Sequence, residues 1–281
     1  MLAGVASEPA GVIFMTSIKI TSKPPKFKNA ILIEGLPGVG NIGRVAVGYL
    51  VEELKAKKFA ELHSEWFFPF VMLHKKYEIH LLKNEFFYWK AKKKGQRDII
   101  MIVGDCQSLS PQGHYEVSDK ILDFAEKLGV TEVITIGGLT TGELEGQSKV
   151  VGAATSEKMM EKYKKFKIDF DAGDKVGYIV GAVGLLLGLW KQKDKEGLCL
   201  LGQTTGFPIV TDPKAAENIL NVLNKILNIQ IDMKKLDKKV KEMEQFIKKV
   251  EMLQKRALSE ITKSGPAERG TKAEEQTRYI G

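Results

Sequence analysis

Cysteine and histidine are scarce in this chain. Its 281 residues include two cysteines, Cys106 and Cys199, and four histidines. The two cysteines form no CxxC pair, and they are too few for the disulfide framework of a small secreted protein or for a zinc site. No Ser/His/Asp order and no pair of carboxylates stands out. We therefore expect no catalytic residue, no metal and no cofactor, and a reducing cytoplasm is the default location.

A long apolar run and a targeting signal are also missing. The most apolar stretch covers only residues 176–190, whereas a helix needs about 20 residues to cross a bilayer. The N-terminus has no basic region and is interrupted by Glu8 and Pro9, which argues against a secretory signal. We expect no membrane partner, and we expect residues 176–190 to lie in the protein core.

The charge is basic and unevenly distributed. Lys and Arg number 43 against 35 Asp and Glu, which gives a formal net charge of +8. Within residues 233–257 the basic residues outnumber the acidic ones nine to four. Such a charge permits contact with an acidic surface but does not require nucleic acid. Nucleic acid is therefore not the expected partner, and it stays a third hypothesis that steep salt-dependent DNA binding would reveal.

The strongest structural signal in the sequence is at residues 30–48, AILIEGLPGVGNIGRVAVG. Residues 30–33 predict a short strand that is buried on both faces. The glycines that follow permit a tight turn. An amphipathic helix is then expected from Asn41, the predicted N-cap, to Lys57 or Lys58. A strand, a glycine turn and a helix open a βαβ unit, which indicates an α/β domain.

Two phosphate-binding patterns are incomplete in this stretch. Gly38, Gly40 and Gly43 fit G-x-G-x-x-G, whose glycines let a pyrophosphate approach the N-terminus of a helix. The acidic residue expected about 20 positions later does not end a clean second strand. A Walker A loop beginning at Gly35 would need Lys-Ser/Thr where Asn41-Ile42 stands. A structural glycine turn is the leading interpretation, and a nucleotide or anion site is the alternative.

Strand and helix patterns alternate along the rest of the chain, which predicts a three-layer α/β/α sandwich. Short antiparallel strands are expected at 71–73, 79–82 and 85–90, and further strands at 98–104, 133–136, 149–154, 175–181 and 198–202. Helices are expected at 120–128, capped by Ser118 or Asp119, and at 156–164, 184–190 and 213–227.

Three of the predicted strands end in glycine-bearing segments, at 35–43, 137–142 and 202–206. Ligands of open α/β sheets bind at the carboxyl edge, where these ends are expected to meet. Small polar residues are also what turns at strand ends require, so a purely structural role stays open. Besides Gly38, Gly40, Asn41 and Gly43, the candidate residues of an anion or nucleotide crevice are Thr140, Thr141, Glu143, Thr204 and Thr205, with Asp105 as a neighbour.

The pattern changes from Ile229 onward. Apolar residues recur every seven positions from Ile229 to Ala257, which predicts an amphipathic helix of about four heptads. This helix could pack on its own domain or pair with another subunit. Residues 1–22 are expected to be poorly ordered, apart from a possible strand at 13–20. The remaining units are an α/β/α core at 23–228, the long helix at 229–262 and a flexible tail at 263–281.

Four motifs together resemble the archaeal proteasome assembly chaperone family, over about residues 25–260. They are GLPGVGNIG at 35–43, IGGLTTGE at 136–143, GAVGLLLGL at 181–189 and LGQTTGFP at 201–208. Such proteins have also been catalogued under an ATP-grasp label. The resemblance implies a nucleoside-phosphorylase-like core and a homo-oligomer, a tetramer or pentamer. It also implies binding to proteasome α subunits or the α ring without consumption of ATP.

The resemblance also draws attention to the C-terminus. Members of the family carry a mobile tail that ends in hydrophobic-Tyr-any residue and enters pockets between α subunits. This chain ends in Arg278-Tyr279-Ile280-Gly281, so its tyrosine is displaced by one position and follows an arginine. Several tails on one symmetric body would still add weak contacts into useful avidity. We therefore expect these four residues to bind the partner, in an ATP-independent assembly chaperone or adaptor. The alternative is an α/β enzyme that uses the glycine-rich crevice.

Overall fold

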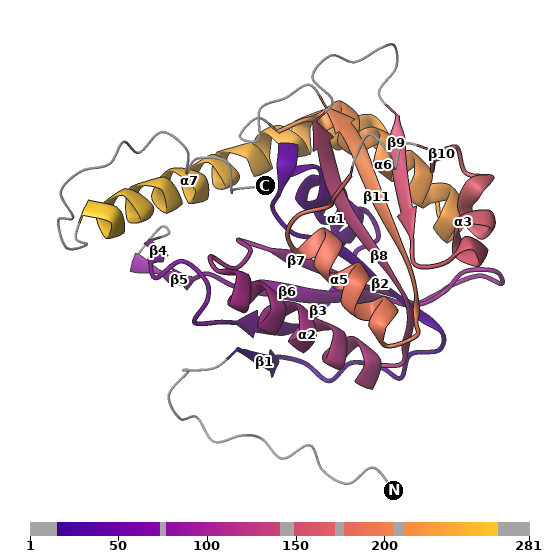
Figure 1. The fold of residues 1–281 in the computed structure, drawn as a ribbon, viewed down its shortest axis with the longest axis horizontal. Coiled ribbons are helices and arrows are strands. Elements are labelled where there is room, and N and C mark those ends of the chain that lie inside the picture. Colours follow the sequence, from indigo (N-terminus) through magenta and orange to yellow (C-terminus); the bar gives the residue numbers. More distant parts are fainter. Residues whose placement is uncertain (1–15, 74–76, 141–148, 172–176, 205–210, 264–281) are drawn as a thin grey trace, which may run out of the picture.

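The computed structural model describes residues 16–73, 77–140, 149–171, 177–204 and 211–263. A nine-stranded sheet forms the middle layer (Figure 1). Its strands, in spatial order, are β1 (Ser17–Ile20), β3 (Lys57–His63), β6 (Asn84–Trp89), β7 (Ile99–Gly104), β2 (Ala30–Gly35), β8 (Val130–Thr140), β11 (Glu196–Thr204), β9 (Val150–Ala154) and β10 (Ile168–Asp169). A separate hairpin pairs β4 (Val71–Leu73) with β5 (Ile79–Leu81).

The centre of the sheet is parallel. Strands β7, β2, β8 and β11 run in one direction, and Ile33 of β2 is paired with Met101 of β7 and Ile134 of β8. Every residue of β2 is buried, as expected for a strand covered on both faces. On one side, β1, β3 and β6 join their neighbours in antiparallel fashion. On the other side, β9 is antiparallel to β11 and parallel to β10.

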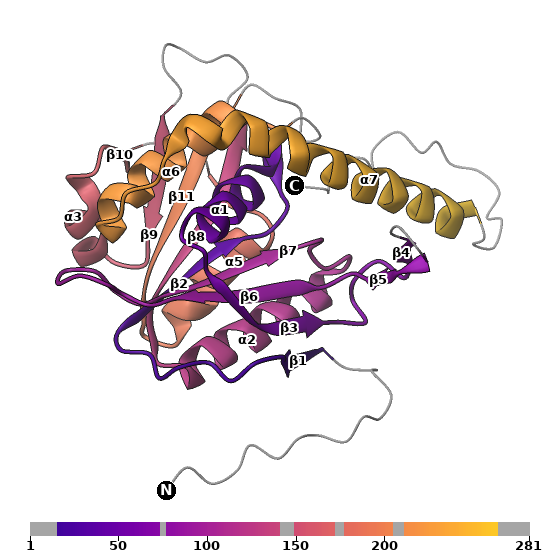
Figure 2. The ribbon, with the colours of Figure 1, turned by 180° about the vertical axis from the view of Figure 1, so that it is seen from behind.

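Helices cover both faces of the sheet, and the predicted three-layer α/β/α sandwich is confirmed (Figures 1 and 2). Side chains alternate along β2, so Ile31 and Ile33 join one core and Leu32 joins the other. On the Ile31 side lie α1 (Ile42–Glu53), α3 (Glu157–Lys164), α6 (Pro213–Leu227) and α7 (Leu236–Lys263), and on the Leu32 side lie α2 (Pro111–Lys127) and α5 (Ala182–Gln192).

Some predicted boundaries were wrong. Helix α2 starts at Pro111 instead of 120, because Ser110 caps it by accepting from the Gly113 N–H and proline suits the first helical turn. The expected caps Ser118 and Asp119 lie inside this helix. Helix α1 ends at Glu53, well before Lys57, and Lys57 and Lys58, where the helix was expected to end, begin the missed strand β3.

Two further expectations concern the ends of elements, and one of them was wrong. The described part of the strand predicted at 175–181 forms no strand, because Gly177 and Gly181 have φ angles of +67° and +78°, and Gly181 is the N-cap of α5. The possible strand at 13–20 is confirmed at its C-terminal end, where Ser17–Ile20 pairs with β3 as an edge strand. The N-terminal segment up to residue 15 lies outside the described residues, as does the tail from 264.

The heptad pattern correctly marks the buried face of α7. The helix begins at Leu236, later than the predicted Ile229, after a short 3-10 turn at Met233–Lys235. It packs back on α1 and α6 of the same chain. The two helices meet at Gly48 of α1, where an added Cβ would lie 2.7 Å from Cε at the flexible end of the Met243 side chain. The fully buried heptad residues of α7 are Leu236, Val240, Ile247 and Val250.

Candidate functional site

The glycine-bearing ends of β2, β8 and β11 lie side by side, as predicted from the sequence. The three strands are parallel neighbours, and Thr140 is paired with Thr204 at the end of the β8–β11 ladder. Strand β7 lies on the other side of β2, which brings Asp105 to the same edge. The other candidates, Thr141, Glu143 and Thr205 and the C-terminal Arg278, Tyr279, Ile280 and Gly281, lie outside the described residues.

The glycines of the first motif serve the packing of the turn. Gly40 has a φ of +62° and is followed by Asn41 at 50°, so the chain makes two consecutive left-handed steps. A Cβ on Gly43 would lie 2.3 Å from the Ile136 carbonyl oxygen of β8. A Cβ on Gly138 would lie 2.2 Å from the Val39 carbonyl oxygen. Glycines are therefore required here for close contact between the turn and the strand, independently of any ligand.

Asn41 is held by α7. It is only 1% exposed, and its side-chain amide donates to the Glu251 Oε1 at 2.9 Å. Asn41 does occupy the N-cap position of α1, but its side chain makes no capping hydrogen bond. The Gly40 carbonyl oxygen accepts from the Asp212 N–H at 3.1 Å. The turn is thus covered by residues from two distant segments of the chain.

A charged cluster joins the turn to the hairpin and to α7. Arg44 Nη2 lies 3.5 Å from Asp105 Oδ1, and the Arg44 guanidinium lies over the Phe246 ring at 5.0 Å. Asp105 Oδ2 lies 2.6 Å from His80 Nε2 and accepts from the Lys83 N–H. Burial lowers the pKa of the Arg44 guanidinium, and the adjacent Asp105 carboxylate opposes that effect. The cluster therefore ties α1, the end of β7, β5 and α7 together.

Carboxylates predominate around the turn. Asp212 accepts from the Thr204 hydroxyl at 2.6 Å and caps α6 by accepting from the Ala215 N–H. Glu34 is fully buried directly before the turn and accepts from the Leu36 N–H, and burial raises the pKa of its carboxyl to about 7. With Glu251, three carboxyl groups lie close to the N-terminus of α1. They occupy the region in which a bound anion would need positive potential.

Neither cysteine is an activated nucleophile. Cys106 and Cys199 are buried, and burial raises the pKa of both thiols, that of Cys199 to about 12. Buried thiols of this kind are unreactive because the thiolate is the nucleophile. Within the described ranges there is no group of three or more His, Cys, Asp or Glu residues suited to hold a metal. None of the described helices combines the length and apolarity required to span a bilayer.

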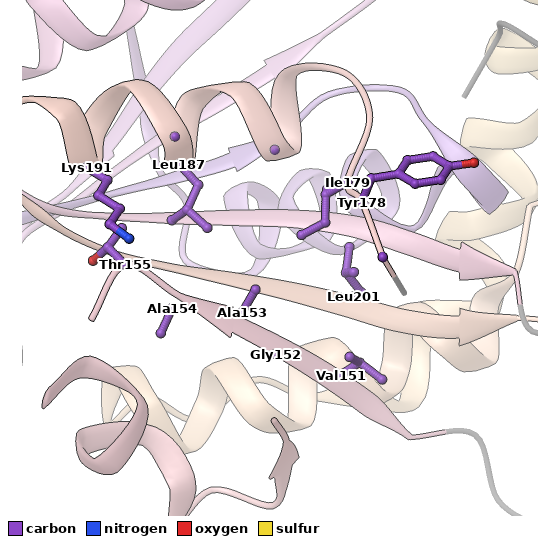
Figure 3. Close-up of a pocket in the computed structure, with 13 residues that line it drawn as sticks. Val151, Gly152, Ala153, Ala154, Thr155, Tyr178, Ile179, Leu187, Lys191 and Leu201 are labelled. Atoms are coloured by element: carbon purple, nitrogen blue, oxygen red, sulfur yellow. The ribbon is translucent and has the colours of Figure 1, made fainter. Parts of the chain in front are cut away.

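A pocket that the sequence analysis missed lies between β9 and α5 (Figure 3). Its volume is about 390 Å³, and its walls are mainly apolar, with Val151, Leu187 and Leu201 inside and Lys191 at one end. Gly184 and Gly188 of α5 also line it. The available signal was this pair of glycines four residues apart, which leaves one face of a helix without side chains.

A comparison with family models identifies the group to which this architecture belongs. The model described as the PAC2 family matches residues 32–251, from β2 through most of α7. The chain belongs to the PAC2 family. An uncharacterised protein of Methanocaldococcus jannaschii is 37% identical to this PAC2 protein over 271 residues, covering 95% of this chain and 100% of the relative.

Solved structures agree with this assignment. Pyrococcus furiosus PbaB, described as an archaeal proteasome activator, is 41% identical, with a TM-score of 0.75 over 84% of this chain and 99% of PbaB. P. furiosus PbaA, described as an archaeal homologue of proteasome-assembly chaperone, is 26% identical, with a TM-score of 0.67 over 85% of this chain and 99% of PbaA. The ATP-grasp label is not supported by the matching family or by these structures.

Proposed function

We propose that this PAC2 protein is an ATP-independent chaperone or adaptor that binds proteasome α subunits. The observation that carries the proposal is the likeness to PbaB over nearly its whole length, at 41% identity. PbaB is described as an archaeal proteasome activator, and PbaA as a homologue of an assembly chaperone. The partner of this chain would accordingly be the α subunits or α ring of an archaeal proteasome, in the cytoplasm.

The strand-end geometry supports a non-enzymatic role. Gly43 and Gly138 have packing reasons for lacking a side chain. The Asn41 amide is bonded to Glu251. The residues that a nucleotide-binding enzyme would direct toward phosphate are thus engaged within the fold. A nucleotide or anion at this crevice stays a prediction, and calorimetric titration with ATP, NAD and nucleosides tests it.

The proposal includes a homo-oligomer, a tetramer or pentamer, that presents several C-terminal tails. Tails linked through one body raise each other's effective concentration at the α ring. Several tails that each bind weakly can therefore bind the ring tightly together. Tyr279 offers a rigid aromatic group with a polar tip. Its displacement from the family position predicts that one tail binds weakly and that avidity supplies the strength.

Removal of residues 264–281 tests the tail directly, because the deletion leaves α7 complete. Binding of the full chain and of the truncated chain to recombinant α subunits should be compared by surface plasmon resonance, with oligomer mass followed by sedimentation. We expect weaker binding and an unchanged mass. Tyr279→Ala should reproduce the loss, whereas Tyr178→Ala, an exposed tyrosine of the body, should not. Equal binding by all variants would remove the tail from the proposal.

A further inference from the structure

The β4–β5 hairpin has two unlike faces. Val71 is paired with Leu81, Met72 with His80, and Leu73 with Ile79. Because side chains alternate along a strand, the middle pair points to one face and the outer pairs to the other. Met72 is fully buried, and His80 contacts Asp105 and lies edge-on to the Phe246 ring of α7 at 6.2 Å. The inner face is therefore fixed to the body.

The opposite face is apolar and open. Its four residues, Val71, Leu73, Ile79 and Leu81, are 46–67% exposed. An antiparallel sheet with one solvated face normally carries polar residues on that face. Apolar residues gathered on an exposed face mark interaction sites more often than single exposed ones do. A hairpin of two strands is also marginally stable alone, so cover on this face would stabilise it.

The apolar surface continues onto α7. Lys249 Nζ donates to the Leu73 carbonyl oxygen at 3.1 Å, which places this part of the helix against β4. Met252 is one turn further along the same side of the helix and is also exposed. Both views show the hairpin beside the distal half of α7, away from the three layers (Figures 1 and 2).

The exposed side of α7 adds positive charge to this surface. Lys238, Lys241 and Lys255 are exposed, and no described carboxylate forms an ion pair with them. Of the described acidic residues of the helix, Asp237 is exposed at its start and Glu244 pairs with Lys248. Glu242 pairs with Lys239, and Glu251 is bonded to Asn41. The surface therefore combines an apolar centre with unneutralised cations along one side.

We propose that the hairpin face and the adjoining side of α7 form a docking surface for a protein segment in which apolar side chains are flanked by carboxylates. We name Val71, Leu73, Ile79, Leu81 and Met252, together with the exposed lysines of α7, the hairpin–helix surface. This inference rests on the proposed function, so the segment belongs to a proteasome α subunit. It adds a contact through the body to the contact through the tails.

The charge distribution distinguishes this occupant from others. A second copy of the chain that docked through this same surface, as in a twofold contact, would bring its own α7 lysines toward the same cations, and such like-charge contacts are costly. Nucleic acid is held through phosphates, which would leave the four outward apolar side chains without a partner. A protein segment that is acidic and partly apolar would contact both the outward apolar side chains of the hairpin and the exposed lysines of α7.

The test uses the full-length chain and recombinant α subunits in a surface plasmon resonance measurement. Leu73→Asp with Ile79→Asp places two charges on the apolar face. The matched control, Leu109→Asp with Tyr115→Asp, changes two other exposed apolar residues, one directly before α2 and one within it. We expect the hairpin variant to bind at least about tenfold more weakly, with the control within about twofold of wild type. Thermal melting confirms that each variant is folded.

Each outcome bears on a specific claim. If wild type binds α subunits and the hairpin variant binds equally well, the docking surface is wrong and the proposed function stands. If wild type binds no α subunit, the proposed function itself fails. A changed oligomer mass in the hairpin variant would assign the surface to a second copy. Loss of binding to anionic vesicles or duplex DNA in that variant, with α-subunit binding retained, would assign it to a membrane or nucleic acid. Either assignment overturns the proposal.

Discussion

The Asn41 side-chain amide donates to Glu251 Oε1 across 210 positions of sequence, at 2.9 Å. One partner belongs to the glycine turn that begins α1, and the other belongs to α7. Glu251 Oε2 has no hydrogen-bond partner among the described residues, so this single bond fixes the carboxylate. The turn that most resembles a phosphate-binding loop is therefore an attachment point for the C-terminal helix.

Asn41→Gly tests that attachment while retaining the left-handed backbone. Loss of one buried hydrogen bond to a carboxylate should cost about 1.5–3 kcal/mol. Amide hydrogen exchange in the distal half of α7 should become faster. Asn228→Gly is the matched control, because Asn228 is also left-handed, at a φ of 51°, but is exposed at the end of α6. Equal protection of α7 in both variants would contradict the attachment.

Two glycines of α1 should respond oppositely to alanine. Gly43→Ala places a Cβ 2.3 Å from the Ile136 carbonyl oxygen, which cannot move without shifting β8, so a loss of about 1–3 kcal/mol is expected. Gly48→Ala meets only the flexible end of Met243 and gains helix propensity of about 1 kcal/mol. Urea unfolding measures both. Unchanged stability of the Gly43→Ala variant would show that Gly43 is not a packing glycine, and a loss of stability in Gly48→Ala would contradict the prediction for Gly48.

Glu34 should make the protein less stable as pH rises. Burial raises the pKa of its carboxyl to about 7 in the folded chain, against about 4.3 in an unfolded chain. The folded state therefore binds the proton more tightly, and stability falls between these two values and levels off above about pH 7. Glu34→Gln should be more stable than wild type at about pH 8, by up to about 4 kcal/mol, and nearly equal at about pH 4.

Urea unfolding at several pH values measures this difference. The exposed Glu65→Gln variant is the matched control, since it changes the same atoms outside the core. Identical pH slopes for wild type and Glu34→Gln would rule out a titrating buried carboxyl at this position.

Glu132 should show the opposite pH dependence. Burial alone would raise the pKa of this carboxyl, but hydrogen bonds from Lys162, Tyr163 and Arg97 outweigh it and lower the pKa. Its contribution to stability is therefore present above the unfolded pKa of about 4.3 and is lost as pH falls through the folded value. Glu132→Gln should cost about 1–3 kcal/mol near pH 7 and much less near pH 3. A difference independent of pH would show that charge is not involved.

Local patterns predicted the layers of the fold and the convergence of the strand ends. The alternation of strands and helices, and the heptads of α7, are periodic signals that short windows of sequence contain. The contact between Asn41 and Glu251 is not such a signal, because it depends on how α7 returns over the sheet. The start of α2 was missed for a different reason. The helix was expected only from residue 120, although serine before proline, as in Ser110-Pro111, also begins helices.

The candidate site was predicted only in part. Asp105 was correctly placed at the strand ends beside the glycine turn, but its partners Arg44 and His80 come from segments that sequence order does not bring together. The hairpin was predicted as strands, yet which face would be exposed depends on the position of α7. Tertiary packing, more than local preference, therefore decides what this edge of the sheet can bind.

The most direct test of the account is binding of the full-length chain to purified proteasome α subunits, first without nucleotide and then with ATP. Sedimentation should show a complex in the absence of nucleotide, and ATP should leave its amount unchanged. Failure to form any complex would contradict the account. So would a complex that requires ATP and is abolished by Gly40→Val, since the glycine turn would then be a nucleotide site.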